Sequence, residues 1–195
     1  MLSYDESLKI LKKTNALLEG HFVLSSGLHS NQYVQCAKLL SYPKQAETIC
    51  TSLTDKIKKN YNKIDMVLSP ALGGIVVGYE IGKQLNVQTI FAERFEGQLI
   101  LRRGFSIPKG SKVLIVEDVI TTGKSVLDCF QLVQKHQANL IGYACIIDRS
   151  DNKVLIKDKI ISQIKFKMLT FKENELPDEL KRIPAVKPGS RNLSR

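Results

Sequence analysis

Residues 112–125 of the 195-residue chain read KVLIVEDVITTGKS, and this stretch decides the fold and the chemistry together. Four apolar residues, Val113 to Val116, lead directly into the acids Glu117 and Asp118. A continuous apolar run is typical of a strand buried on both faces of a parallel sheet. The polar residues after it then lie at the carboxyl edge of that sheet, where ligands bind in open α/β folds.

The turn after the acids predicts a phosphate site. Thr121, Thr122 and Gly123 precede a helix expected to start near Lys124, and its first N–H groups form a nest for an anion. The threonines and Ser125 add hydroxyl donors, and the glycine lets the backbone approach the ligand closely. The turn therefore fits a phosphate without further assumption.

Glu117 and Asp118 need a different partner, because carboxylates repel a phosphate. One ligand with two ends satisfies both features: a phosphate for the turn, and sugar hydroxyls or a chelated metal for the acids. A ribose 5-phosphate has that shape. The plain alternative is that the acids only favour the positive end of the helix dipole, but the dipole does not require TTG between them and the helix.

A second turn, LSPALGG (68–74), also follows a predicted strand and precedes a helix. Alone it is a weak signal, and an ordinary strand-to-helix turn explains it equally well. Two anion-binding turns on neighbouring strands are more informative, because they predict a ligand with phosphate at both ends.

Two better-known phosphate motifs are excluded. A Walker A loop requires glycine five positions before Gly123, and Asp118 stands there. The segment GGIVVG (73–78) is not a dinucleotide fingerprint, because Ile75 occupies the third position. Neither a nucleoside triphosphate site nor a dinucleotide fold is supported.

The rest of the chain predicts one α/β domain, residues 1–195. Ser3 and Glu6 form a capping box for a helix expected to stop at Gly20. The other expected elements are strands at 22–27, 32–40, 66–69, 87–93, 112–117 and 139–148, helices at 43–59, 75–85 and 124–136, a hairpin-like excursion at 96–105, a loop from Asp118, and an irregular tail at 172–195. Apolar strands alternating with helices argue for a central parallel sheet flanked by helices.

Composition sets further bounds. The net charge of +10 suits phosphorylated ligands, but the basic residues are spread along the chain and form no nucleic-acid-binding block. No apolar run reaches the roughly 20 residues that span a bilayer, and the acids near the N-terminus do not fit a secretory signal. The four cysteines lack metal or disulfide spacing. We expect a cytoplasmic protein with reduced, buried thiols and no nucleic-acid or membrane partner.

The stretch VLIVEDVITTGKS resembles the phosphoribosyl-diphosphate (PRPP) signature of the type I phosphoribosyltransferases. Three other segments resemble the orotate branch of that family: FVLSSGLHSNQYVQCAKLL (22–40), CIIDRS (145–150) and AVKPGSR (185–191). The resemblance implies the type I fold, with a core of about residues 43–150 and a small hood built from about 1–40 and 164–195.

The resemblance also implies an activity: transfer of the 5-phosphoribosyl group from PRPP to orotate with Mg²⁺, giving orotidine 5′-phosphate and diphosphate in UMP biosynthesis. It assigns the ribose hydroxyls to Glu117 and Asp118, with Asp118 also catalytic and in contact with the metal through water. The remaining PRPP-binding residues implied are Val119, Ile120, Thr121, Thr122, Gly123, Lys124 and Ser125 for the 5-phosphate, and Ala71, Leu72, Gly73 and Gly74 for the pyrophosphate. The orotate-binding residues implied are Thr121, Arg149, Tyr33 and Val34, with Arg149 pairing the carboxylate.

The chain departs from the family in one loop. Most members carry a mobile loop with a lysine and a histidine over the pyrophosphate, but residues 91–105 contain neither. Their cations are Arg94, Arg102 and Arg103, and Arg94 is the expected catalytic one. The lysine usual before the SG pair is Ser25. The family also implies a homodimer in which this loop serves the neighbouring subunit.

Two other functions fit parts of the pattern. A purine phosphoribosyltransferase would share the PRPP turns, but Arg149 suits a carboxylated base and favours orotate. A PRPP-sensing regulator of nucleic acid would keep the fold and lose the chemistry. That function needs an added DNA-binding module, and the helix before Gly20 is too short to be one.

Overall fold

The computed structural model of the chain describes residues 1–24, 26–150, 154–156 and 158–188. The helices are α1 (Tyr4–Lys13), α2 (Cys36–Leu40), α3 (Pro43–Asn60), α4 (Gly73–Leu85), α5 (Lys124–Lys135), the 3₁₀ helix η1 (Glu173–Glu175) and α6 (Asp178–Lys181). The strands are β1 (Leu17–Val23), β2 (His29–Val34), β3 (Met66–Pro70), β4 (Gln88–Phe95), β5 (Gln98–Leu101), β6 (Lys112–Ile120), β7 (Asn139–Asp148), β8 (Ile160–Lys165) and β9 (Thr170–Phe171).

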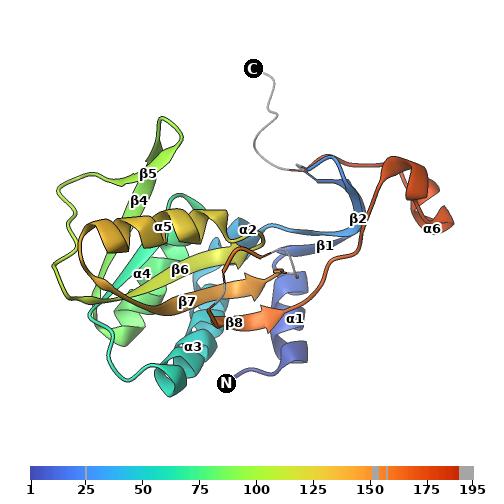
Figure 1. Cartoon of the computed structure of the whole chain (residues 1–195). Helices are drawn as coiled ribbons and strands as arrows, with labels where there is room; N and C mark the ends of the chain where they lie inside the picture. Colours follow the sequence, from blue (N-terminus) through green and yellow to red (C-terminus); the bar gives the residue numbers. More distant parts are fainter. Residues whose placement is uncertain (25, 151–153, 157, 189–195) are drawn as a thin grey trace.

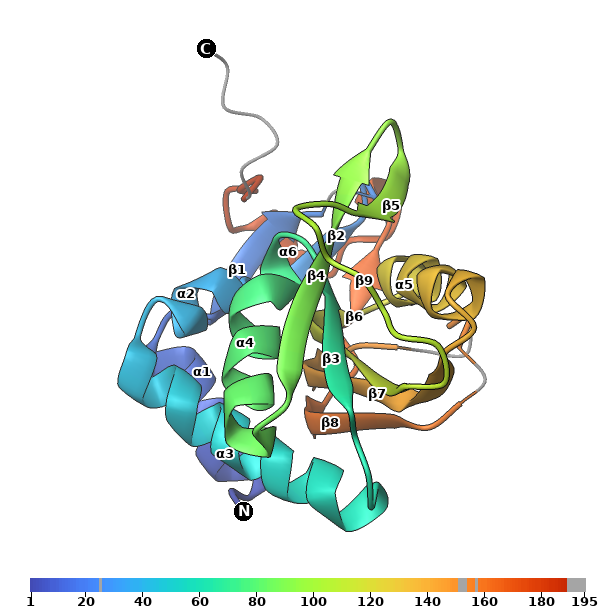
Figure 2. The ribbon, with the colours of Figure 1, turned by 90° about the vertical axis from the view of Figure 1, so that its left-hand side faces the viewer.

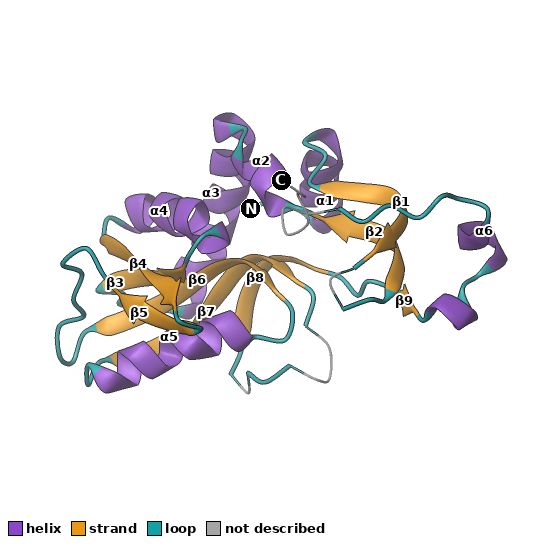
Figure 3. Ribbon diagram, turned by 90° about the horizontal axis from the view of Figure 1, so that it is seen from above, coloured by secondary structure: helices purple, strands orange, loops and turns teal. Residues whose placement is uncertain are grey.

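Within the described residues, the central sheet has six strands in the order β5-β4-β3-β6-β7-β8. All neighbouring strands are parallel except β4 and β5, which form an antiparallel hairpin. Helices α3 and α4 cover one face and α5 covers the other (Figure 3). The predicted α/β architecture is confirmed, and the excursion is a hairpin as expected.

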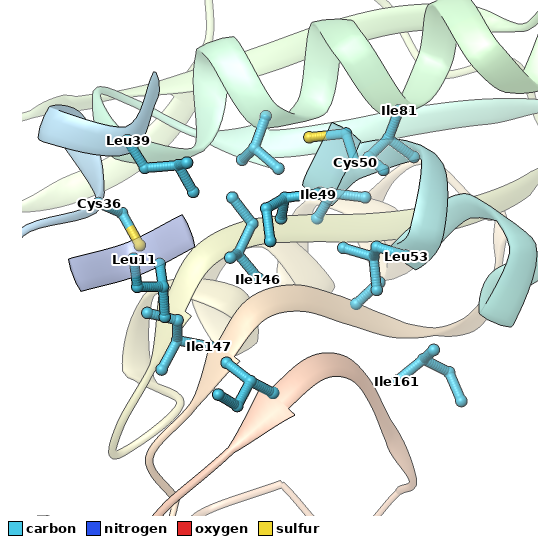
Figure 4. Close-up of a cluster of buried hydrophobic side chains, with 14 of the residues drawn as sticks. Leu11, Cys36, Leu39, Ile49, Cys50, Leu53, Ile81, Ile146, Ile147 and Ile161 are labelled. Carbon is cyan, nitrogen blue, oxygen red and sulfur yellow. The ribbon is translucent and has the colours of Figure 1, made fainter. Parts of the chain in front are cut away.

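Strand β6 is buried on both faces, which explains its continuous apolar run. Leu114 and Val116 belong to a core cluster packed under α3 and α4, whereas Val113 and Ile115 belong to a second cluster packed under α5. Figure 4 shows the first cluster, in which Ile49 of α3 lies among side chains of the sheet. Burial of each such side chain stabilises the fold by roughly 1.5–3 kcal/mol. Strand β6 is therefore held firmly in place, and so is the start of the turn that follows it.

A smaller sheet of order β1-β2-β9 lies beside the main one, and the tail extends its edge (Figure 1). Val186 forms a parallel bridge with Phe22. Its N–H donates to the carbonyl of His21 at 2.8 Å, and its carbonyl accepts from the N–H of Val23 at 2.8 Å. The tail therefore covers an edge of β1 that would otherwise expose unpaired backbone groups.

The first helix is shorter than the capping pattern predicted. Ser3 and Glu6 do form the capping box, with the Ser3 N–H 2.7 Å from the Glu6 carboxylate and the Glu6 N–H 3.2 Å from the Ser3 hydroxyl. The helix ends at Lys13 rather than Gly20, because Asn15 adopts a left-handed φ of 55° and turns the chain into β1. Pairing with β2 overrides the helical spacing of the leucines.

Three further boundaries differ from expectation. The segment 32–40, expected as a strand, changes from β2 to the helix α2. The loop expected to begin at Asp118 starts only after Ile120, because β6 stays paired with β7 to that residue. Strands β8 and β9 were not predicted, and η1 and α6 interrupt the tail expected to be irregular.

The expected division into a core and a hood stays a prediction, although the small sheet is consistent with it. No helix in the described ranges is both long and apolar enough to cross a membrane. All four cysteines are free and buried, as the spacing predicted.

Candidate active site

Two turns meet at the carboxyl edge of β3 and β6. Strand β3 leads through Ala71 and Leu72 into α4, and β6 leads through residues 121–123 into α5. A Cβ added at Gly73 would lie 2.8 Å from both carboxylate oxygens of Asp118. The first residue of α4 therefore touches the acid near the end of β6, and the two predicted phosphate turns border one site.

The turn before α4 offers its helix N–H groups to an anion. No side chain caps this helix, whose N-cap is Leu72. The N–H groups of Gly73 and Gly74 at its start have no intrahelical acceptor, whereas the Ile75 N–H donates to the Leu72 carbonyl at 3.1 Å. Gly74 lies within that first turn and is buried. The N–H of Ala71 is different, because it already donates to the carbonyl of Ala92 at 2.8 Å. The donors available to a pyrophosphate thus start after Ala71.

The turn before α5 is shaped by Gly123. This residue is the N-cap of α5 and has a left-handed φ of 83°, which glycine adopts without strain. A Cβ there would lie 2.9 Å from Ile156, so glycine is also required by space. The turn borders a hollow of about 60 Å³ lined by Glu117 and by Val119 to Val126. The predicted 5-phosphate residues are brought together as expected.

The acids Glu117 and Asp118 have different environments. The Glu117 side chain is 9% exposed, whereas Asp118 is half-buried and faces the turn before α4. The Asp118 N–H donates to Glu117 Oε1 at 3.0 Å, and the Val119 N–H donates to Asp118 Oδ1 at 2.8 Å. Burial, together with the neighbouring Asp118 carboxylate, raises the pKa of Glu117 to about 9. At neutral pH the Glu117 carboxyl therefore keeps its proton.

The raised pKa of Glu117 predicts how the stability of the fold depends on pH. Between the unfolded pKa near 4.5 and the folded pKa of about 9, the folded state binds one more proton, so the free energy of unfolding falls as pH rises. Glu117→Gln removes this dependence. We expect the melting temperature of the variant to match wild type near about pH 5 and to exceed it by at least about 2–4 °C near about pH 8.5.

Thermal unfolding at several pH values measures this difference. The matched control is Glu47→Gln, at an exposed position of α3, and its difference from wild type is expected to stay flat with pH. A Glu117→Gln difference that did not grow with pH would show that the buried carboxyl titrates normally.

Arg149 follows the last residue of β7 and is a cation without a counter-ion among the residues that the structure describes. Its N–H donates to the carbonyl of Ile120 at 2.8 Å, which fixes it beside the 5-phosphate turn. Its Nε is buried and has no hydrogen-bond partner among the described residues. Burial lowers the pKa of its guanidinium, and the nearby ionisable groups that oppose this are Tyr33 and Cys36. A half-buried arginine whose Nε is buried without a partner among the described residues is suited to an anionic ligand.

The two β2 residues expected at the base differ from each other. Tyr33 is half-buried and stacks on Phe22, with ring centroids 5.7 Å apart, and it lies close enough to Arg149 to influence its pKa. Val34 is buried within the main core cluster. The structure therefore brings Tyr33 to Arg149, whereas the Val34 side chain packs into the core.

The arginines near the hairpin have different partners. Arg94 donates to the carbonyl of Gly97 at 2.6 Å and pairs with Asp128 of α5 at 3.0 Å. Arg103 forms two hydrogen bonds to Glu93, at 2.8 and 3.1 Å. Arg102 lies over the Phe95 ring, 5.6 Å from its centroid. The hairpin projects from the sheet (Figure 2). To bind a ligand, an arginine would have to exchange these contacts for contacts with the ligand.

Some residues near the site were not predicted. The Cys36 thiol donates to the carbonyl of Asp118 at 3.9 Å, and burial raises its pKa. Asp148 is buried directly before Arg149. The acid in CIIDRS was visible in the sequence, but no sequence signal marked Cys36. Ser25, where the family usually has lysine, lies outside the described residues, as does the end of the AVKPGSR segment.

Comparison with known proteins identifies the family of this site. Residues 40–175 match the phosphoribosyl transferase domain. A curated relative, the orotate phosphoribosyltransferase of Caldicellulosiruptor bescii, is 47% identical over 190 residues, which cover 97% of this chain and 99% of the relative.

Solved structures show the same fold. The orotate phosphoribosyltransferase from Aeropyrum pernix has a TM-score of 0.67 at 23% identity, over 81% of this chain and 92% of that one. The adenine phosphoribosyltransferase from Thermoanaerobacter pseudethanolicus has a TM-score of 0.59 at 19% identity, over 69% and 88% of the two chains. Because both bases occur on this fold, the fold alone does not select orotate.

Proposed function

The chain belongs to the phosphoribosyl transferase family, and we propose that it is the orotate enzyme of that family. It transfers the 5-phosphoribosyl group from PRPP to orotate and releases diphosphate. The near-complete coverage of the 47% identical orotate phosphoribosyltransferase supports this substrate. The product, orotidine 5′-phosphate, is a precursor of UMP.

The observation that favours orotate over a purine is Arg149. Its buried Nε has no partner in the described part of the chain, and no residue within that part forms an ion pair with it under 4.0 Å. Orotate carries a carboxylate that can accept from the guanidinium, whereas adenine carries none. A site that holds an unpaired buried cation rejects an uncharged base, because the cation then stays unsatisfied.

The two turns suit the two ends of PRPP. We assign the 5-phosphate to residues 121–125 and the pyrophosphate to the start of α4, chiefly Gly73 and Gly74. The ribose hydroxyls then lie against Glu117 and Asp118, between the turns. Thr121, at the tip of the first turn, contacts orotate together with Tyr33.

The reaction forms a bond from orotate nitrogen to the anomeric carbon and breaks the bond from that carbon to pyrophosphate. Positive charge develops on the ribose and negative charge on the leaving group. The Asp118 carboxylate stabilises the first charge, and the N–H groups at the start of α4 stabilise the second. Because Glu117 is protonated at neutral pH, its carboxyl can donate to a ribose hydroxyl as well as accept.

Mg²⁺ fits this arrangement. Magnesium prefers one or two carboxylates together with waters and substrate phosphates. The described residues contain no cluster of three or more His, Cys, Asp or Glu that could hold a metal by themselves. Asp118 keeps one carboxylate oxygen beyond the one bonded to the Val119 N–H, so it would hold the ion through water while PRPP supplies the main ligands. When bound, the ion neutralises charge on the leaving pyrophosphate.

Turnover tests the assignment directly. The protein is incubated with PRPP, Mg²⁺ and orotate, and separately with adenine or hypoxanthine, and diphosphate release is measured. We expect release with orotate only. Release with a purine but not with orotate would overturn the substrate, and no release with any base would support the PRPP-sensing regulator.

We propose that the enzyme is cytoplasmic. All four cysteines are free and buried, which suits a reducing environment.

We also propose a homodimer whose hairpin serves the neighbouring subunit, with Arg94 as the cation that meets the pyrophosphate. Helix α4 and its N-cap residue present an exposed apolar stripe of Leu72, Val76 and Tyr79, which are 84%, 49% and 66% exposed. These residues are four and three positions apart and share one helix face. An exposed apolar stripe of this kind is typical of an interface, and a second copy buries it symmetrically.

Mixing two inactive variants tests both parts of this proposal. Arg94→Ala lacks the hairpin cation, and Asp118→Asn lacks the acid. In a mixed dimer one site keeps both groups, so random exchange is expected to restore about a quarter of wild-type turnover. Sedimentation measures the dimer independently. No recovery from a mixture that does contain mixed dimers would assign the hairpin to its own subunit or remove Arg94 from the reaction.

A further inference from the structure

Asp148 uses both of its carboxylate oxygens next to Arg149. The residue lies at the end of β7 and is buried. Its Oδ1 accepts from the N–H of Ser150 at 2.8 Å, and its Oδ2 pairs with Lys165 Nζ of β8 at 3.0 Å. The carboxylate thus bridges across Arg149, from the residue before it to the residue after it, and closes a tight side-chain-to-backbone turn.

The backbone around this turn is anchored on both sides. The Arg149 N–H donates to the carbonyl of Ile120 at 2.8 Å, and the Asp148 carbonyl accepts from the N–H of Phe166 at 3.1 Å. These bonds tie the turn to β6 on one side and to the end of β8 on the other. Beyond Arg149, the Asp148 carboxylate constrains the direction in which the chain leaves β7, because it accepts from the Ser150 N–H.

The negative charge of Asp148 could interfere with ligand binding by Arg149. A buried carboxylate next to an arginine that has no counter-ion among the described residues is a potential competitor for its guanidinium. Lys165 Nζ lies 3.0 Å from Asp148 Oδ2, the oxygen that Ser150 leaves free, so its ammonium neutralises this carboxylate. The Lys165 side chain is 64% exposed while that of Asp148 is 3% exposed, so the lysine reaches inward from the surface to this one acid.

We propose that Asp148 is a positioning residue for Arg149, and that Lys165 keeps the Asp148 carboxylate from competing with the substrate for the guanidinium. This inference rests on the proposed function, since it treats Arg149 as the group that binds the orotate carboxylate. It adds a reason why Asp148, the acid next to Arg149 in the chain, does not pair with it: Lys165 already neutralises that carboxylate.

Steady-state kinetics with each substrate varied tests the proposal. Asp148→Ala is expected to raise the KM for orotate at least about tenfold and to leave the KM for PRPP within about threefold, because only the arginine is misplaced. Lys165→Met is expected to raise the KM for orotate at least about threefold, since the acid becomes free to bind Arg149. In Asp148→Asn/Lys165→Met the amide still accepts from Ser150 and carries no charge, so the KM for orotate is expected to return to within about threefold of wild type.

Asp65 supplies a matched control at the opposite edge of the sheet. It accepts from the N–H of Lys112 at 2.8 Å and pairs with Lys63 at 3.6 Å, so it makes the same two kinds of contact far from the turns. Asp65→Ala is expected to change neither KM. If Asp148→Ala raised both KM values equally, or if the double variant bound orotate no better than Lys165→Met, the proposal would be overturned.

Wild-type turnover is measured first, so that failure of the proposed function is recognised separately. Amide hydrogen exchange in the protein without substrate then tests the turn by itself. We expect the Ser150 N–H to exchange at least about tenfold faster in Asp148→Ala than in wild type, because its acceptor is gone. Unchanged exchange would contradict the positioning role whatever the enzyme's substrate.

Discussion

Replacing Arg149 with alanine is expected to raise the KM for orotate by at least about a hundredfold, while the KM for PRPP changes by less than about threefold. Removing one partner of a buried charge contact costs roughly 2–5 kcal/mol, and about 2.7 kcal/mol corresponds to a hundredfold. Arg149→Lys should fall between, because an ammonium cannot make the two parallel hydrogen bonds of a guanidinium. Initial rates with each substrate varied in turn measure the two effects.

The same variant should not lose stability. In the protein without substrate the Arg149 Nε is buried without a partner in the described residues, and burial disfavours its charge. Removing it relieves that cost, so we expect the melting temperature of Arg149→Ala to be at least that of wild type. Arg182→Ala, at an exposed position after α6, is the control and should leave both KM values unchanged. A parallel loss of affinity for orotate and PRPP would mean that Arg149 supports the whole site rather than the carboxylate.

The turn at residues 121–123 was predictable because its determinants are local. An apolar strand, two acids, a glycine and a helix start follow one another within 112–125, and each feature has a direct physical meaning. The same holds for the turn before α4. Their contact could be expected from the topology alone, since neighbouring parallel strands end at one edge. The structure confirms it, because a Cβ added at Gly73 would lie 2.8 Å from the Asp118 carboxylate oxygens.

Features that depend on distant partners were not predictable. The helix expected to reach Gly20 ends at Lys13, because residues 17–23 pair with β2 in a sheet. The helical spacing of the apolar residues in this segment does not predict that pairing. Strand β8 reads IISQIK and carries a weak apolar pattern. Its identity comes from pairing with β7, which is what brings Lys165 to Asp148.

The hairpin shows the same limit at the level of function. The sequence identified Arg94, Arg102 and Arg103 as the available cations, with Arg94 as the expected catalytic one, but it did not predict the contacts that each of them makes. Their different contacts come from residues apart in the chain, such as Asp128, which is 34 positions from Arg94. Such pairings depend on how the elements pack together, and a single sequence does not predict them.

Asp118→Asn is expected to lower kcat by about 10- to 100-fold, a loss of about 1.4–2.7 kcal/mol. Asparagine retains an oxygen that accepts from the Val119 N–H, which is 2.8 Å from Asp118 Oδ1, so the local backbone should stay in place. What disappears is the negative charge beside the ribose, and with Glu117 protonated at neutral pH no second carboxylate replaces it. The loss should therefore appear in kcat at saturating PRPP and orotate, because the carboxylate stabilises a charge that develops only in the transition state.

Gly73→Ala should impair the same acid by a steric route. Its Cβ would lie 2.8 Å from both Asp118 oxygens, so the carboxylate must move away from the ribose while its charge is kept. We expect a fall in kcat of similar size together with weaker PRPP binding, because the start of α4 is displaced as well. Asp55→Asn on α3 serves as the acid-to-amide control. If Asp118→Asn turned over at the wild-type rate while Gly73→Ala did not, the position of the α4 turn, and not the charge of Asp118, would be what accelerates the reaction.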